Sequence, residues 1–224
     1  MHDQQPQRYP PPQDRERPAW ALIGPGIAAL TGLYLLTMSL WPTAQQAALH
    51  LSGQTVLLTT VVSYLVSAAA GGALGAGLGA RLPTTAGMSA IAFLIIGVLL
   101  DGFAPNAGIL LIGRVLSGLG AGGAVGTTVA LVRRTGRHRG VLVAILAGLG
   151  LLALIAGPFV NRWLSMALTW RFGYLIALLP LAAGLVAAAV SGLVLLSRRP
   201  AQPVPAGVPY PPAGQRPWNA PPET

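Results

Sequence analysis

The stretch of sequence that decides the fold is residues 107–132, which read AGILLIGRVLSGLGAGGAVGTTVALV. Arg114 is the one charged residue in this run, and most of the others are aliphatic or glycine. At a rise of about 1.5 Å per residue, a helix of this length exceeds the hydrocarbon core of a bilayer, which is about 30 Å thick. The run is too long for a strand and lacks the polar–apolar alternation of a barrel strand. It therefore predicts a membrane-spanning helix.

Five other apolar runs have the length that a transmembrane helix needs, which is about 20 residues. They cover residues 19–41, 55–79, 85–103, 140–160 and 170–197. We therefore expect an all-α membrane protein in which residues 19–199 form a six-transmembrane-helix bundle. The flanking segments, residues 1–18 and 200–224, are rich in proline and poor in apolar residues. Such segments cannot bury enough apolar surface to offset the entropy of ordering, so we expect two disordered cytoplasmic tails.

The composition excludes an ordinary soluble enzyme. Hydrophobic residues make up 53% of the chain and charged residues 8%, whereas a soluble domain carries about 25% charged residues. The chain has no cysteine and no lysine, which removes thiolate nucleophiles, cysteine metal sites and phosphate loops that need a lysine. His2, His50 and His138 fall in tails or loops. We expect no enzymatic activity, no cofactor and no bound metal.

The chain is strongly basic, with a formal net charge of +9 at pH 7. Its arginines stand between apolar runs, a distribution that suits membrane orientation better than binding of nucleic acid. If the helices alternate in direction, most arginines share the side of the two chain ends, and only Arg162 and Arg171 face the other side. The positive-inside rule then predicts that both termini are cytoplasmic. The bias towards arginine, alanine, glycine and proline is typical of a GC-rich bacterial genome, so we expect a multi-pass protein of the bacterial inner membrane, with the lipid bilayer as its first partner.

Two of the predicted helices carry glycine at every fourth position, so the glycines of each helix share one face. They are Gly71, Gly75 and Gly79 in the second run, and Gly118, Gly122 and Gly126 in the fourth. Lipid tails are as apolar as leucine, so helices in a bilayer associate through close packing of small residues. We expect these faces to bring backbones close together. Generic membrane packing and a transport role that needs sliding helices explain them equally well.

Arg114 and Asp101 are the charged residues closest to the interior of the predicted bundle. Arg114 lies about 10 Å from the outer end of the fourth helix, where a charge is costly unless it snorkels or faces polar surroundings. It either snorkels to the outer interface or lines a substrate or ion path, paired with an acid or a carbonyl. Asp101, at the end of the third helix, is either a solvated acid of the outer loop, a partner for Arg114 or a proton site. We expect no acid deep inside a helix, which argues against proton coupling by this chain alone.

Three prolines lie within the apolar runs. Proline removes a backbone hydrogen bond and kinks a helix. Gly157 and Pro158, near the outer end of the fifth helix, mark either a hinge or the end of that helix. Gly24-Pro25 and Pro180 are expected to kink the first and sixth helices in the same way.

In their order along the chain, these motifs resemble the N-terminal half of a major facilitator superfamily transporter, particularly the drug:proton antiporter branches. Residues 110–122, LLIGRVLSGLGAG, look like that family's Arg-x-x-x-Gly-x-x-x-Gly motif, and residues 139–140 look like the Arg-Gly that opens its fifth helix. Residues 157–158 are similar to the antiporter Gly-Pro motif, and residues 170–174, WRFGY, are similar to its Trp-Arg-x-x-Phe segment. The resemblance covers residues 19–199 and implies transport of a small molecule.

The chain also departs from the family pattern. The loop after the second helix keeps only Arg81 of the motif Gly-x-x-x-Asp-Arg-x-Gly-Arg-Arg, whose acid helps to latch the two halves of full-length members. Six helices correspond to one half, whereas family members bind substrate between two halves.

Two functional hypotheses follow. The first is a half-size efflux transporter that works as a homodimer or with a second transporter half. The alternative is a non-transporting accessory or scaffold protein that keeps a degenerate transporter fold. Under the first hypothesis, the candidates for transport or gating are Arg114, Asp101, Gly118, Gly122, Gly157, Pro158 and Arg81.

Overall fold

The computed structural model of the protein describes residues 19–40, 49–50, 52–135 and 139–197. Within these ranges, six helical spans are long and apolar enough to cross a membrane. This confirms the predicted all-α bundle of six helices. The tails that the sequence predicts at residues 1–18 and 200–224 lie outside the described residues.

The bounds of the helices follow the apolar runs closely. The first span joins the 3₁₀ segment η1 (Ala19–Leu22) to α1 (Ile23–Leu40). The second runs without a break through α3 (Gly53–Val56), the π-helical segment η2 (Leu57–Val62) and α4 (Ser63–Arg81). The next three spans are α5 (Pro83–Phe103), α6 (Ala107–Arg133) and α7 (Arg139–Ala167). The sixth consists of α8 (Trp170–Leu175) and α9 (Leu178–Ser197).

Local chemistry explains where the central helices begin. Pro83 occupies the first turn of α5, where a helix has no partner for the backbone N–H that proline lacks. A single residue, Leu82, separates α4 from α5. The Asn106 side chain caps α6 by accepting a hydrogen bond from the backbone N–H of Ile109 at 3.0 Å, as asparagine commonly does at this position. Because both connections are short, α4, α5 and α6 lie side by side.

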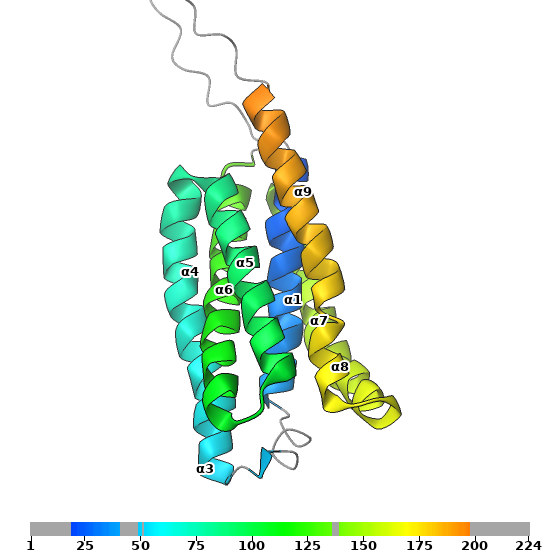
Figure 1. Cartoon of the computed structure of the whole chain (residues 1–224). Coiled ribbons are helices and arrows are strands. Elements are labelled where there is room, and N and C mark those ends of the chain that lie inside the picture. Colours follow the sequence, from blue (N-terminus) through cyan, green and yellow to red (C-terminus); the bar gives the residue numbers. More distant parts are fainter. Residues whose placement is uncertain (1–18, 41–48, 51, 136–138, 198–224) are drawn as a thin grey trace, which may run out of the picture.

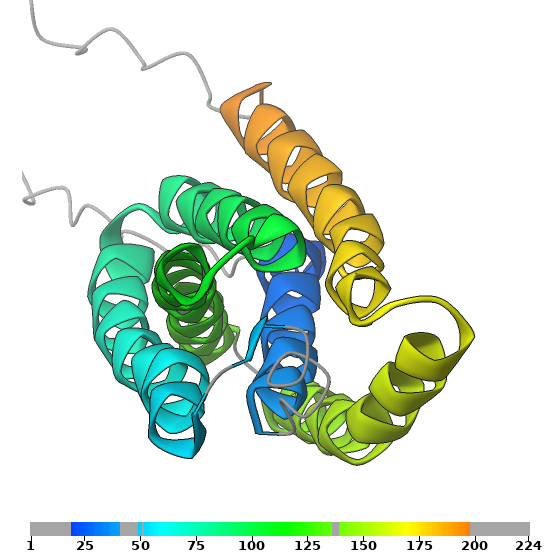
Figure 2. The same cartoon turned by 60° about the horizontal axis from the view of Figure 1, so that its bottom comes forward.

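The spans form two layers (Figures 1 and 2). Helices α4, α6, α1 and α7 stand in one row, in that order, and each packs against the next. Helices α5 and α9 form the second layer, on the same side of α6 and α1. Figure 1 also shows that the described chain ends, at Ala19 and Ser197, lie at the same end of the bundle. The opposite end, where α5 ends and α6 begins, is called the α5–α6 end below.

The glycine faces of the second and fourth spans pack against each other. A Cβ atom on Gly71 would lie 2.9 Å from the carbonyl carbon of Leu119, and one on Gly122 would lie 2.7 Å from the carbonyl carbon of Ala68. Real Cβ atoms essentially never approach another heavy atom within 3.0 Å, so these positions accept only glycine without movement of a backbone. The predicted close approach is confirmed, and the tertiary structure adds that each face is the other's partner.

The structure corrects one interpretation of the fifth helix. Helix α7 continues through Pro158 to Ala167, so the alternative in which Gly157 and Pro158 mark its end is wrong. In the first span, Pro25 lies in the first turn of α1, directly after η1. In the first turn of a helix, the N–H that proline lacks has no partner within that helix, so Pro25 removes no hydrogen bond of α1.

The sixth span is interrupted at the residues before Pro180, where the sequence predicts a kink. Proline has no N–H, so Pro180 cannot bond to the carbonyl of Ile176 four residues earlier. That carbonyl instead accepts a hydrogen bond from Leu179 N at 3.3 Å. The break separates the short helix α8 from the long helix α9 (Figure 1).

Candidate functional site

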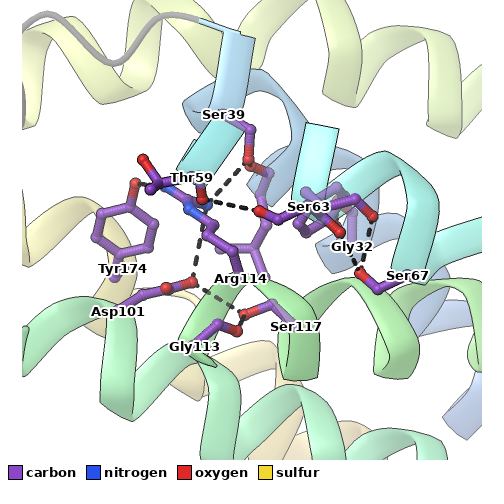
Figure 3. A network of polar contacts seen from close by, with 12 residues as sticks. Gly32, Ser39, Thr59, Ser63, Ser67, Asp101, Gly113, Arg114, Ser117 and Tyr174 are labelled. Carbon is purple, nitrogen blue, oxygen red and sulfur yellow. Dashed lines mark hydrogen bonds and ion pairs between the residues drawn. The ribbon is translucent and has the colours of Figure 1, made fainter. Parts of the chain in front are cut away.

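Arg114 projects into the bundle from α6, about two turns from the start of that helix. Its side chain is 0% exposed. Figure 3 shows it among residues of α1, α5, α6 and α8 and of the second span, η2 and α4. The guanidinium therefore does not snorkel to an interface, and the structure favours the alternative in which it pairs with an acid.

Asp101 is the acid that pairs with Arg114. Arg114 Nη1 and Asp101 Oδ2 are 3.7 Å apart, and both side chains are 0% exposed. The interpretation of Asp101 as a solvated acid of the outer loop is wrong, because its side chain is fully buried against Arg114 of α6. Asp101 lies in the last turn of α5, so the expectation that no acid lies deep inside a helix is not contradicted, although the acid is buried in the bundle. A buried ion pair in an apolar span is costly, which makes it a candidate functional site.

Three hydroxyl groups complete the site (Figure 3). Arg114 donates hydrogen bonds to Ser39 Oγ on α1, at 2.9 Å, and to the hydroxyl of Tyr174 on α8. Its Cζ atom also lies 4.9 Å from the centre of the Tyr174 ring, a distance suited to a cation–π interaction. Ser117, one turn after Arg114, donates to Asp101 Oδ2 at 2.9 Å. These five residues form what we call the Arg114 network.

Two buried polar atoms of the network have no hydrogen-bond partner in the part of the chain that the structure describes, namely Asp101 Oδ1 and Arg114 Nε. Buried polar atoms are almost always satisfied, so an exception suggests a role other than stability. The carboxyl group lies against the backbone of Gly113, where a Cβ atom would be 2.9 Å from Asp101 N and 3.1 Å from Asp101 Cγ. Glycine at 113 therefore makes the room in which Asp101 sits.

The Arg114 network connects four helical segments from both layers near the α5–α6 end. Ser39 belongs to α1, Asp101 to α5, and Tyr174 to the short helix α8. Chemically, the network can hold helices in a fixed arrangement and can bind a proton on its carboxyl group. No three His, Asp or Glu side chains come together in the described ranges.

The other predicted site residues lie apart from this network. Gly118 and Gly122 form the interface with α4, and a Cβ atom on Gly118 would be 2.5 Å from the carbonyl oxygen of Tyr64. Arg81 is exposed at the last turn of α4, which lies at the end of the bundle opposite the network (Figure 1). The structure thus brings Arg114 and Asp101 together and leaves the remaining candidates elsewhere.

Gly157 and Pro180 line a groove between α1, α7 and the junction of α8 with α9. The groove has a volume of about 400 Å³. Its walls are almost wholly apolar, and its polar side chains are Thr31 and Tyr34 of α1. Both hydroxyls already donate to backbone oxygens, that of Tyr34 to Gly173 O at 3.1 Å. The groove has no charged side chain among these lining residues.

The hydroxyl partners of Arg114 were not predicted from the sequence. Tyr174 lies in the motif at residues 170–174. A tyrosine carries a hydroxyl group on an apolar ring, and this property was the signal in the sequence for a buried polar partner. Ser39 carried no signal, because it stands 75 residues away from Arg114 in the sequence. Ser117 lies within the glycine-rich motif of α6 and was visible only as a small residue.

Comparison with known proteins identifies the family. The family model described as Major Facilitator Superfamily matches residues 22–220. A multidrug resistance protein B homolog from Mycobacterium tuberculosis is 31% identical over 153 residues, which are 67% of this chain and 28% of that protein. An uncharacterized MFS-type transporter of the same species is 29% identical over 119 residues, which are 50% of this chain and 17% of that protein. An MFS thioclapurine efflux transporter from Claviceps purpurea is 32% identical over 91 residues, which are 40% and 17% of the two chains.

The chain spans less than a third of the length of these curated relatives. The family model nevertheless matches most of the chain, from the first helix onwards, and the six apolar spans make it a multi-pass membrane protein. The resemblance inferred from the motifs around Arg114 is therefore confirmed. This chain belongs to the major facilitator superfamily of membrane transporters.

Proposed function

We propose that this chain forms one six-helix half of an efflux transporter for small molecules. The names of similar proteins support this reading, since one is a multidrug resistance protein homolog and another an efflux transporter. In this proposal the protein is a transporter and has no enzymatic role. Its substrate crosses the membrane between the row of helices formed by α4, α6, α1 and α7 and a second set of helices.

The observation that carries the proposal is the unequal burial of the helices in that row. Over the most apolar stretch of each span, 72% of α6 is buried within the described structure. The corresponding share is 33% for the second span and only 11% for α7. Helices α4 and α7 stand at the two ends of the row (Figure 2), so each has a face available to a further helix.

Small residues on α7 favour a helix rather than lipid as the neighbour of that face. Gly140, Ala144 and Gly148 are exposed and one turn apart, and a Cβ atom on either glycine would meet nothing within 4 Å. Faces of this kind let another helix approach closely. We propose that a second copy of this chain, or another transporter half, packs there and completes the pathway.

The buried residues then act as structural elements of a moving half. Transporter halves rock about a central site as nearly rigid bodies. The Arg114 network ties α1, α5, α6 and α8 together, and Gly118 and Gly122 hold α4 on α6, so the bundle moves as one unit. In a bacterial inner membrane, the exposed arginines Arg81, Arg133 and Arg139 lie on the cytoplasmic side together with both chain ends.

A transport assay in proteoliposomes tests the proposal. The full chain is reconstituted, and movement of ethidium, a fluorescent lipophilic dye, is followed for native protein, Arg114→Ala and Gly77→Ala. Gly77 is the matched control, because a Cβ atom there meets nothing within 4 Å. We expect dye movement above that of empty liposomes for native protein and the control, and a loss for Arg114→Ala. Equal movement for native protein, Arg114→Ala and empty liposomes refutes it.

The same preparation distinguishes the transporter from the alternative, a non-transporting accessory or scaffold protein. Departures from the family motifs favour that alternative, such as the loop after α4, which keeps only Arg81 of its motif. The mass of the protein in lipid nanodiscs shows whether it pairs with itself. A stable complex with another membrane protein, together with an absence of dye movement, would favour the scaffold. A homodimer that moves the dye would favour the transporter.

A further inference from the structure

Exposed arginines gather at one corner of the bundle, where α4 and α6 end. Arg81 is the last residue of α4, Arg133 is the last residue of α6, and Arg134 follows it; all three are exposed. Arg134 donates a hydrogen bond to the backbone oxygen of Ala80, the residue before Arg81. This bond ties the two helix ends together. We call the three arginines the α4–α6 corner.

The packing of α6 against α4 directs Arg133 to the same corner. Gly126 faces α4, since a Cβ atom there would lie 2.6 Å from the backbone nitrogen of Ala76. Arg133 comes seven residues, or about two turns, after Gly126 and therefore points in nearly the same direction. Because α4 ends at Arg81, the exposed Arg133 side chain extends past the last turn of α4.

The positive charge of the corner exceeds the negative charge that the described residues supply there. The carboxyl end of a helix carries about half a negative charge, so the ends of α4 and α6 offset about one of three positive charges. Within the described ranges, the side chains of Arg81 and Arg133 form no hydrogen bond or ion pair. Asp101 is the one acid in those ranges, and it is paired with Arg114 at the α5–α6 end. About two positive charges thus lack a counterion.

A second copy of this chain would not supply that counterion from its helices. It would bring the same arginines, and its one acid within the described ranges would be the buried Asp101. The other four acids of the chain lie in the terminal segments outside those ranges; they are Asp3, Asp14, Glu16 and Glu223. The surroundings of a membrane protein offer a further source of negative charge, the phosphate headgroups of anionic lipids.

The surface of α4 beside the corner is apolar and suits a lipid chain. Leu74, Leu78 and Arg81 follow at a helical spacing that places them on one face, and the two leucines are 60% and 51% exposed. Gly77 leaves open space on this face, because a Cβ atom there would meet nothing within 4 Å. Arginine at the end of a membrane span reaches headgroup level, with the leucines in the hydrocarbon beside it. This is the pattern of a phospholipid, which has a charged head and apolar chains.

We propose that the α4–α6 corner binds the headgroup of an anionic phospholipid, with an acyl chain lying along Leu74 and Leu78. The planar fork of an arginine presents several N–H donors that match phosphate oxygens. Arg81 and Arg133 supply the free donors, and Arg134 adds its charge. The ligand is a lipid of the bilayer and not a transported molecule, so this proposal and the dye assay succeed or fail independently.

The measurement is the preference of the protein for one lipid over another. The full chain is reconstituted in phosphatidylcholine with a trace of spin-labelled phosphatidylglycerol or spin-labelled phosphatidylcholine. Electron spin resonance separates the slowed lipids that contact the protein from the bulk lipid. An arginine near a membrane surface favours anionic lipid by about fivefold, so we expect native protein to prefer phosphatidylglycerol by about fivefold or more. Added salt should weaken this preference by screening the charges.

A pair of double variants locates the site. Arg81→Gln with Arg133→Gln removes both free guanidinium groups and leaves Arg134 in place. The matched control is Arg139→Gln with Arg162→Gln, which removes two exposed arginines from α7, at the other end of the row of helices. We expect the corner variant to lose the preference for phosphatidylglycerol and the control to retain most of it. Circular dichroism should show the same helix content in both variants as in native protein.

A soluble competitor separates a lipid site from a general phosphate site. Glycerol phosphate carries the phosphate of the headgroup without the acyl chains. If the chains contribute along α4, it should not displace the spin-labelled lipid at the same concentration.

Three outcomes overturn the proposal. One is a native protein without a preference for phosphatidylglycerol. Another is an equal loss of the preference in the corner variant and the control, because net charge would then be the cause. The third is full displacement by glycerol phosphate at equal concentration, because the site would then recognise phosphate and not a lipid.

Discussion

Replacement of Gly122 by alanine is the most direct test of how α4 and α6 are held together. A Cβ atom on Gly122 would lie 2.7 Å from both the carbonyl carbon of Ala68 and the backbone nitrogen of Gly72, and closer still to Ala68 O. Ordinary van der Waals contact begins at 3.4 Å. The atoms in the way are backbone atoms of α4, so no rotation of a side chain relieves the clash.

The size of the effect follows from this geometry. To reach ordinary contact, α4 and α6 must separate by about 1 Å along much of their interface, and overpacking of this kind usually costs about 1–3 kcal/mol. Because the obstruction is backbone, we expect the upper part of that range, about 3 kcal/mol. Gly77→Ala is the matched control. Its Cβ meets open space, and alanine favours helix over glycine by about 1 kcal/mol.

Both variants are measured by reversible unfolding in mixed micelles, with the fraction of helix as the signal. A pair of spin labels on the exposed positions Leu74 of α4 and Val125 of α6 reports the separation of the two helices. We expect Gly122→Ala to lose stability and to lengthen this separation, and Gly77→Ala to do neither. If Gly122→Ala is as stable as Gly77→Ala, the idea that glycine permits this backbone contact is refuted.

Two further predictions concern the network and the sixth span. Arg114→Ala leaves Asp101 buried without its partner and should lower the free energy of unfolding by about 3–5 kcal/mol; the same unfolding assay checks this, and a loss smaller than that of Gly122→Ala would contradict it. Pro180→Ala restores an N–H that can bond to Ile176 O, so α8 and α9 should join into one helix. A label pair across the break should then show a narrower distance distribution, and an unchanged distribution would mean that another residue causes the interruption.

Much of the fold was determined by the sequence because the solvent of this protein is hydrocarbon. A run such as residues 107–132 has no stable arrangement in a bilayer other than a spanning helix, since every backbone N–H and C=O needs a partner within the segment. The spacing of Gly118 and Gly122 likewise identified a close-packing face without any knowledge of its partner. These are local properties, and local properties can be read from a single chain.

The tertiary structure alone decided where the charges go and what they touch. Asp101 stands next to the end of its helix, where a sequence pattern cannot distinguish a solvated acid from a buried one. Its burial depends on the rotation of α5 against α6 and on the room left by Gly113. The partners of Arg114 come from α1 and α8, at sequence separations of 75 and 60 residues. No periodicity in the sequence encodes such contacts, because they arise only when six independently stable helices settle against one another.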